Sequence, residues 1–280
     1  MPRLSKKPAV QPDVLEVIHH EIPENAAAAG AAPIPPPSYG EGGMTWRRML
    51  RSFMAIDAIG FTALLVIAMA AYDLSFFPPL AIAAVLLAIG VYLVPRMTKA
   101  STVYSLVVCS LVLVMFGGLF FGFSGFFFPQ SWFEMSWAAL TTLIPIGGVV
   151  AAIATLRHKN GADAAKRTGL VISGLAAVTV VVGLVGTVMA EDATRLPGDV
   201  TVSASNSEFT TKAITAKAGD VAIYFDNQDP FAHNVSIKGH GASDIAAGKS
   251  VRHVFKAMTA GTYEFFCEVH PDMKGTLTVT

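Results

Sequence analysis

Residue types that bind soft metal ions lie close together near the C-terminus. Cys267, His270 and Met273 follow one another with two residues between each pair, and His233 lies upstream in a separate segment. The four side chains offer a thiolate, two imidazoles and a thioether. Because the thiolate and thioether favour Cu(I) while imidazole suits both Cu(I) and Cu(II), this donor set is typical of a blue, type 1 copper site.

The spacing also indicates how these side chains reach one metal ion. Cys267 is predicted to end a β-strand, which fixes its backbone. His270 and Met273 then lie on one tight loop that turns back toward the same point, and His233 comes from the start of a neighbouring strand. We therefore expect one copper ion held by His233, Cys267, His270 and Met273, with Met273 as the weak axial ligand.

Zinc and a purely structural role are the alternatives for this motif. A structural zinc site needs further Cys or His ligands in spaced pairs. Only His240 and His253 remain in this part of the chain, and neither has such a partner. His240 lies between two glycines and is expected in a solvated loop, whereas His253 is expected to point outward from a strand. The structural alternative makes Cys267 a core thiol and Met273 a packing residue.

Short β-like segments surround the motif after Pro197. Gly, Asp, Asn and Pro turns separate them at even spacing, which is typical of a sandwich or barrel. The register of the segment around His253 stays open, because both Val251 and Val254 fit an alternating pattern. The predicted strands are Val200–Ala204, Phe209–Ala216, Val221–Asp226, His233–Lys238, Ser250–Ala257, Gly261–Cys267 and Thr276–Thr280.

The chain before Pro197 has the composition of a membrane protein. Charged residues make up 14% of the sequence, against about 25% in soluble proteins. Five apolar runs have close to the roughly 20 residues that a helix needs to cross a bilayer. A set of buried soluble helices is the alternative, but such helices would have no polar faces for water. The runs are Phe53–Tyr72, Phe76–Val94, Val103–Phe123, Trp137–Leu156 and Leu170–Ala190.

The distribution of Lys and Arg predicts the orientation. Basic residues precede the first run and lie between the second and third runs and between the fourth and fifth. The alternate loops, 73–75 and 124–136, contain neither Lys nor Arg. By the positive-inside rule the N-terminus is cytoplasmic, and five crossings place the C-terminal domain outside the membrane.

The predicted organisation has four parts. Residues 1–45 form a disordered tail rich in Ala, Gly and Pro, residues 46–190 a five-helix membrane domain, residues 191–197 a linker, and residues 198–280 the copper domain. The two cysteines, Cys109 and Cys267, lie in different media and are not expected to form a disulfide.

The helices themselves offer little chemistry. No histidine lies within the apolar runs, which argues against a haem held between two helical histidines. Asp57 is the one acid inside a run, and we expect it to be hydrated or paired with an arginine near the cytoplasmic interface. Three glycine pairs are expected to mark close helix packing: Gly117-Gly118, Gly147-Gly148 and Gly183-x-x-Gly186.

The C-terminal segments together resemble the cupredoxin family, and within it the plastocyanin/amicyanin branch. The resemblance covers about residues 198–280 and includes Phe225-x-Asn227-x-Asp229 before His233. It implies a Greek-key β-sandwich, three strong ligands and axial Met273. Asn234 matches the residue that bonds across to the cysteine loop. His270 matches the ligand whose ring reaches an apolar patch through which electrons cross, expected here at Pro230, Phe231, Pro271 and Met258.

The sequence therefore predicts a membrane-anchored electron carrier that cycles Cu(II)/Cu(I) outside the cell membrane, serving a respiratory chain. Its partner would be a redox protein such as a cytochrome or respiratory complex with a basic docking face. No small-molecule substrate is expected, and the zero net charge predicts no nucleic-acid partner. A copper-handling module and a relay subunit of a larger respiratory complex are the alternatives. An oxidase or nitrite reductase would require further His clusters, so we do not expect an enzyme.

Overall fold

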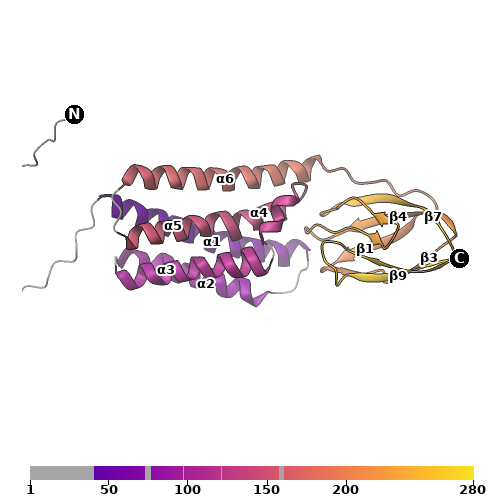
Figure 1. The fold of residues 1–280 in the computed structure, drawn as a ribbon, viewed down its shortest axis with the longest axis horizontal. Coiled ribbons are helices and arrows are strands. Elements are labelled where there is room, and N and C mark those ends of the chain that lie inside the picture. The colour runs from indigo at the N-terminus through magenta and orange to yellow at the C-terminus, as the bar shows by residue number, and fades with distance from the viewer. Residues whose placement is uncertain (1–40, 73–76, 97, 121, 158–160) are drawn as a thin grey trace, which may run out of the picture. The chain divides into compact units, whose positions relative to one another are not determined.

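A computed structural model describes residues 41–72, 77–96, 98–120, 122–157 and 161–280. It contains a helical part followed by a β-domain, both coloured by residue number in Figure 1. The predicted disordered tail, residues 1–45, lies almost wholly outside the described residues, and the first described helix begins at Glu41. The division into four parts stays a prediction.

Within the part of the chain that the structure describes, five helices are long and apolar enough to cross a membrane, as expected from the five apolar runs. These spans are Thr45–Ala70, Pro78–Arg96, Lys99–Leu119, Trp132–Leu156 and Ala162–Met189. Large apolar side chains are exposed along them, for example Leu170 at 76% and Val188 at 83%. Such surfaces are stable in lipid and not in water, so the chain is a membrane protein.

Several spans contain more than one helical segment. The third and fourth spans each include a π-helical stretch, and a short 3₁₀ segment precedes the turn before the fourth. The segments are α1 (Glu41–Tyr72), α2 (Pro78–Leu93), η2 (Val94–Arg96), α3 (Lys99–Val112), η3 (Leu113–Leu119), η4 (Gly122–Phe127), α4 (Trp132–Ala138), η5 (Ala139–Leu143), α5 (Ile144–Leu156) and α6 (Ala162–Met189).

Glycines allow these helices to pack closely, as the sequence predicts. A Cβ on Gly147 would lie 2.6 Å from the ring of Phe53, and one on Gly148 would lie 2.5 Å from the sulfur of Cys109. A Cβ on Gly183 would lie 2.6 Å from Met135 of α4. Gly118 is the exception, because nothing lies within 4 Å of its Cβ position.

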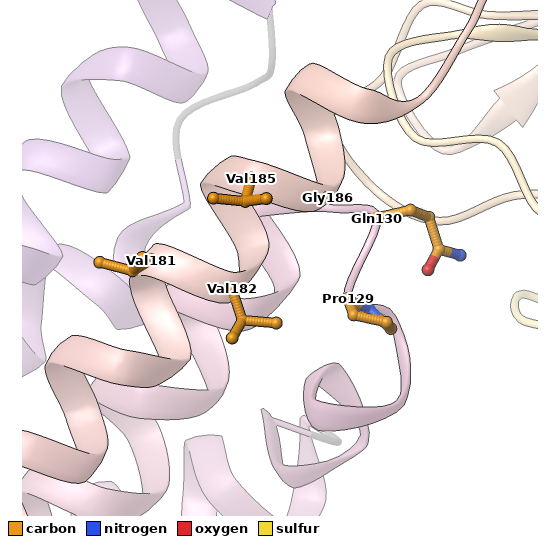
Figure 2. Close-up of a pocket in the computed structure, with 6 residues that line it drawn as sticks. All are labelled: Pro129, Gln130, Val181, Val182, Val185 and Gly186. Atoms are coloured by element: carbon orange, nitrogen blue, oxygen red, sulfur yellow. The ribbon is translucent and has the colours of Figure 1, made fainter.

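An apolar groove of about 420 Å³ lies between α6 and the turn before α4. Figure 2 shows its lining, in which Val181, Val182 and Val185 project from α6 beside Pro129 and Gln130. The lining contains no acid, base or thiol, so this groove offers no group for acid–base or nucleophilic chemistry.

The β-domain is a two-sheet Greek-key sandwich, as predicted. One sheet has the order β2-β1-β4-β7 and the other β3-β9-β8-β5-β6. The strands are β1 (Val200–Ser205), β2 (Glu208–Phe209), β3 (Ala213–Ala216), β4 (Gly219–Asn227), β5 (Ser236–Ile237), β6 (Gly241–Ala242), β7 (Ser250–Met258), β8 (Gly261–Phe266) and β9 (Lys274–Val279). Phe209, Phe225, Phe255 and Phe265 fill the space between the sheets, each 1% exposed or less.

Three expectations about single residues and strands are wrong in detail. The predicted strand Phe209–Ala216 is split into β2 and β3. His253 lies opposite buried Ile223, on the inner face of its sheet. The centroids of its ring and of the Phe255 ring are 4.7 Å apart. His253 does not point outward, because the strand takes the register through Val251. Met258 is 1% exposed within the core and therefore cannot belong to a surface patch.

The segment between the two parts is bonded to the β-domain. The chain leaves α6 after Met189, and the carboxylate of Asp192 already accepts hydrogen bonds from the backbone N–H (2.9 Å) and hydroxyl (3.1 Å) of Ser250. The N–H of Ala193 donates to the carbonyl of Ser250 at 3.0 Å. Residues 190 and 191 are thus the only positions between the end of α6 and the first of these bonds.

Candidate metal centre

The structure brings three of the predicted ligands together at one end of the sandwich. His233, Cys267 and His270 place one ligand atom each within 4.8 Å of one another, and this is the one such cluster among the described residues. The Nδ1 atoms of the two histidines lie 3.0 Å apart, and Nδ1 of His233 lies 3.7 Å from the sulfur of Cys267. Cys267 and His233 are fully buried, and His270 is half-buried.

The loop from Cys267 to Met273 is a closed turn. Cys267 directly follows β8, and its N–H donates to the carbonyl of Met273 at 3.1 Å. The N–H of Met273 donates to the carbonyl of His270 at 2.9 Å, and the side chain of Met273 is 3% exposed in the same core cluster as Cys267. The two-residue spacings therefore position His270 and Met273 on the loop that Cys267 begins.

His233 is held by a different part of the domain. Its backbone pairs with Ala246 through two hydrogen bonds of 2.8 and 2.9 Å. This pair lies three residues before β5, so the strand that the sequence predicts to start at His233 starts later. Because β5 pairs with β8, His233 and Cys267 approach from adjacent strands, as expected.

Asp229 fixes the ring of His233, a role that the sequence pattern alone does not predict. One carboxylate oxygen lies 3.1 Å from Nε2 of His233, and both residues are fully buried. With Nε2 carrying the proton shared with Asp229, Nδ1 is free to bind a metal, which is a common arrangement at metal sites. The sequence signal is the position of an Asp four residues before the predicted ligand His233.

The Asp229 carboxylate also binds the turn between β1 and β2, which belongs to the sheet β2-β1-β4-β7. The N–H groups of Asn206 and Ser207 each donate to Asp229 at 2.8 Å. These two residues have φ near +56° and +57°, the left-handed conformation that leaves both N–H groups free to point at one acceptor. Asp229 therefore couples the β1–β2 turn to the metal site.

Asn234 bridges the two ligand-bearing segments, and this prediction is confirmed. Its amide oxygen accepts from the N–H of Glu268 at 2.9 Å, and its amide nitrogen donates to the Glu268 carboxylate at 2.9 Å. Asn234 is 2% exposed. A bonded amide at this position holds the two loops at a fixed separation.

The surroundings of Cys267 favour the thiolate. Burial raises the pKa of this thiol, but hydrogen bonds from His233, His270 and the Asn234 backbone outweigh burial and lower the pKa to about 6. For His233, burial lowers the pKa, and the hydrogen bonds to Asp229 and Cys267 raise it above its usual value. A thiolate is the form that binds a metal ion.

The donor set fits a type 1 copper ion. A thiolate and two imidazoles converge, a buried thioether lies on the same loop, and neither cysteine forms a disulfide. His240 and His253 stand apart from the cluster, the former beside Tyr263 and the latter beside Phe255. The four residues thus match copper chemistry and lack the paired ligands of a structural zinc site.

Comparison with known proteins gives the same result. A family model described as a cupredoxin-like domain matches residues 174–279. Amicyanin of Paracoccus versutus is 32% identical over 93 residues, which cover 31% of this chain and 70% of the relative. Amicyanin-alpha of Methylorubrum extorquens is 32% identical over 87 residues, which cover 29% of this chain and 72% of the relative.

A solved structure is similar to part of this chain. The crystal structure of amicyanin from Paracoccus versutus is 27% identical and covers 31% of this chain and 85% of that chain, with a TM-score of 0.27. Through its C-terminal blue-copper domain, this chain belongs to the cupredoxin-like family.

Proposed function

We propose that the protein is a membrane-anchored carrier of single electrons in which His233, Cys267, His270 and Met273 hold one type 1 copper ion. The observation that carries this proposal is the convergence of a thiolate and two imidazoles in a largely buried site. Cys267 and His233 are fully buried, and Met273 is 3% exposed. A redox role needs such a closed site, whereas catalysis on a substrate needs an open coordination position.

Bound copper would supply the Cu(II)/Cu(I) couple, and the chain would keep the surroundings constant between the two states. Asp229 fixes the His233 ring, and Asn234 fixes the spacing of the loops. Backbone N–H groups near the sulfur stabilise the Cys267 thiolate. Because these groups are hydrogen-bonded in place, little rearrangement would accompany electron transfer.

The edge of His270 is the route that fits exchange with another protein. His270 is half-buried, and Pro271 and Asp272 beside it are exposed. Among residues 191–280 there are 11 acidic and 8 basic residues, and Glu268 and Asp272 are exposed on the cysteine loop. A redox partner with a basic docking face, such as a cytochrome or a respiratory complex, suits this charge, which mainly raises the encounter rate.

The location proposed for this exchange is the outer face of the cell membrane, with the N-terminus in the cytoplasm. The alternation of basic and uncharged loops supports it. Anchoring keeps the carrier at high effective concentration near a membrane-bound respiratory chain. No small-molecule substrate or nucleic acid enters this proposal.

The visible spectrum of the full-length protein in detergent tests the copper site. Added Cu(II) should produce an intense blue thiolate-to-copper band, and Cys267→Ser should abolish it. Cys109→Ser is the matched control, since Cys109 is buried among the helices and should leave the band unchanged. Colourless metal in the unmodified protein, or rapid loss of copper to a chelator, would instead favour a copper-handling module.

A further inference from the structure

The loop that carries His233 makes contacts with the membrane domain as well as with the copper site. The hydroxyl of Ser131, which caps α4 by accepting the N–H of Glu134 at 3.1 Å, donates to the carbonyl of Pro230 at 2.8 Å. The N–H of Ala232 donates to the carboxylate of Glu134 at 3.3 Å. Two polar bonds therefore join the first turn of α4 to residues directly before a metal ligand.

An apolar contact lies beside these bonds. The rings of Phe133 and Phe231 meet edge to face, with centroids 4.8 Å apart. Phe231 packs against a buried cluster that Phe133 forms with Leu64 and Ala68 of α1. Edge-to-face aromatic pairs add to the stabilisation from buried area, so Phe231 is the apolar anchor of this joint.

These contacts lie on one side of the two loops that carry the predicted copper ligands, the loop before His233 and the loop from Cys267 to Met273. Phe231 lies 6.5 Å from the ring of His233, and Pro230 is buried. The sequence predicts Pro230 and Phe231 on an open patch for protein partners, but in the structure the membrane domain covers them.

The short connection between α6 and the β-domain also favours docking of the loop that carries His233 on α4. Asp192 and Ala193 are bonded to Ser250, so residues 190 and 191 alone link α6 to the bonded part of the β-domain. A domain on so short a connection stays near the helices. The entropy lost when its loop docks on α4 is therefore small.

We propose that the first turn of α4 is a built-in docking partner of the copper loop, and that Glu134 is a positioning residue that holds the loop through the N–H of Ala232. The inference rests on the proposed function for its meaning, because it determines which side of the copper site an outside protein can reach. Pro230 and Phe231 contact the membrane domain of the same chain. The His270 edge, with Pro271 and Asp272, is left for the external partner.

Hydrogen–deuterium exchange of the full-length, copper-loaded protein in lipid nanodiscs tests the docking at single amides. In the unmodified protein the N–H of Ala232 should exchange slowly. Glu134→Ala removes its acceptor and Phe133→Ala removes the apolar contact, so each should speed this exchange at least tenfold. Glu134→Gln retains an oxygen acceptor and should restore slow exchange, which a general loss of packing at this position would not do.

Two controls separate docking from folding. Phe127→Ala makes the same change as Phe133→Ala at a 71% exposed ring of η4 and should leave Ala232 exchange unchanged. The N–H of His233, which donates to Ala246 inside the β-domain, should stay protected in every variant. A retained blue band with equal Ala232 exchange in the unmodified protein and Glu134→Ala would overturn the docking. A missing blue band in the unmodified protein would overturn the proposed function instead.

Discussion

Asp229 in the β-domain and Asp57 in helix α1 are both buried carboxylates, 0% and 1% exposed, with opposite surroundings. Asp229 contacts two backbone N–H groups and the ring of His233. Neither carboxylate oxygen of Asp57 has a hydrogen-bond partner among the described residues. The expected pairing of Asp57 with an arginine is therefore wrong for this structure, and its expected hydration stays a prediction.

The difference follows from the backbone around each residue. In a helix the N–H groups past the first turn already donate to carbonyls four residues earlier, so none is left for a side chain. A turn whose residues have positive φ leaves N–H groups free, as at Asn206 and Ser207. A buried carboxylate can therefore find backbone N–H donors beside an irregular turn but not beside a regular helix. At a metal site, a carboxylate fixed in this way can orient a ligand side chain.

The largest expected effect belongs to Asp229. Asp229→Ala should leave two backbone donors and the His233 ring without their acceptor, which we expect to lower the free energy of unfolding by on the order of 3 kcal/mol. Copper affinity should fall by roughly 10- to 100-fold, the usual cost of losing the partner of a ligand histidine. Competition with a chelator of known affinity measures this change.

Asp226→Ala is the matched control for this change. Asp226 is half-buried, and its carboxylate accepts a hydrogen bond from the side-chain amide of Gln228 at 3.1 Å. It should bind copper as the unmodified protein does. Equal affinity of Asp229→Ala and the unmodified protein would show that the contact with His233 does not orient the ligand, and the comparison with Asp57 would lose its basis.

Asp57 should respond in the opposite direction. Burial of an unpartnered polar group costs about 1–3 kcal/mol by mutational measures, so Asp57→Leu should raise the stability of the helices by up to that amount. Loss of helical circular dichroism during titration with a denaturing detergent measures it. A destabilised Asp57→Leu protein would show that this carboxylate has a stabilising partner in the membrane, and the contrast with Asp229 would fail.

Local patterns in the sequence were sufficient to predict the ligand loop and the spans. Cys267, His270 and Met273 lie within one turn, and five apolar runs need no tertiary information. The donors to Asp229 lie 22 and 23 positions away, and Ser131 lies 99 positions from Pro230. The periodic patterns of helices and strands relate only nearby residues, so they do not predict contacts over such sequence distances. The inward side of His253 likewise depends on its pairing with β4, which alternation alone left open.

Asp199 provides an intermediate case, with the smallest expected effect. Its carboxylate accepts from Nε and a terminal nitrogen of Arg252 at 2.8 and 2.9 Å, and from the N–H of Leu196 at 2.8 Å. The hydrogen bonds from Arg252 are the main reason that its pKa lies below the usual value. A lowered pKa means that the carboxylate stabilises the fold above the unfolded-state pKa of about 3.9, and that this contribution is lost as the pH falls through the folded-state pKa.

Asp199→Asn should therefore lower the melting temperature of the β-domain at neutral pH by a few degrees or less, and the difference from the unmodified protein should shrink as the pH falls below about 4. Differential scanning calorimetry of the copper-free full-length protein measures it without interference from metal loss in acid. Asp244→Asn, at an exposed position, controls for removal of one negative charge. A constant difference across this pH range would mean that Asp199 acts through packing alone, and a carboxylate with bonded donors would then carry no electrostatic advantage over one without them.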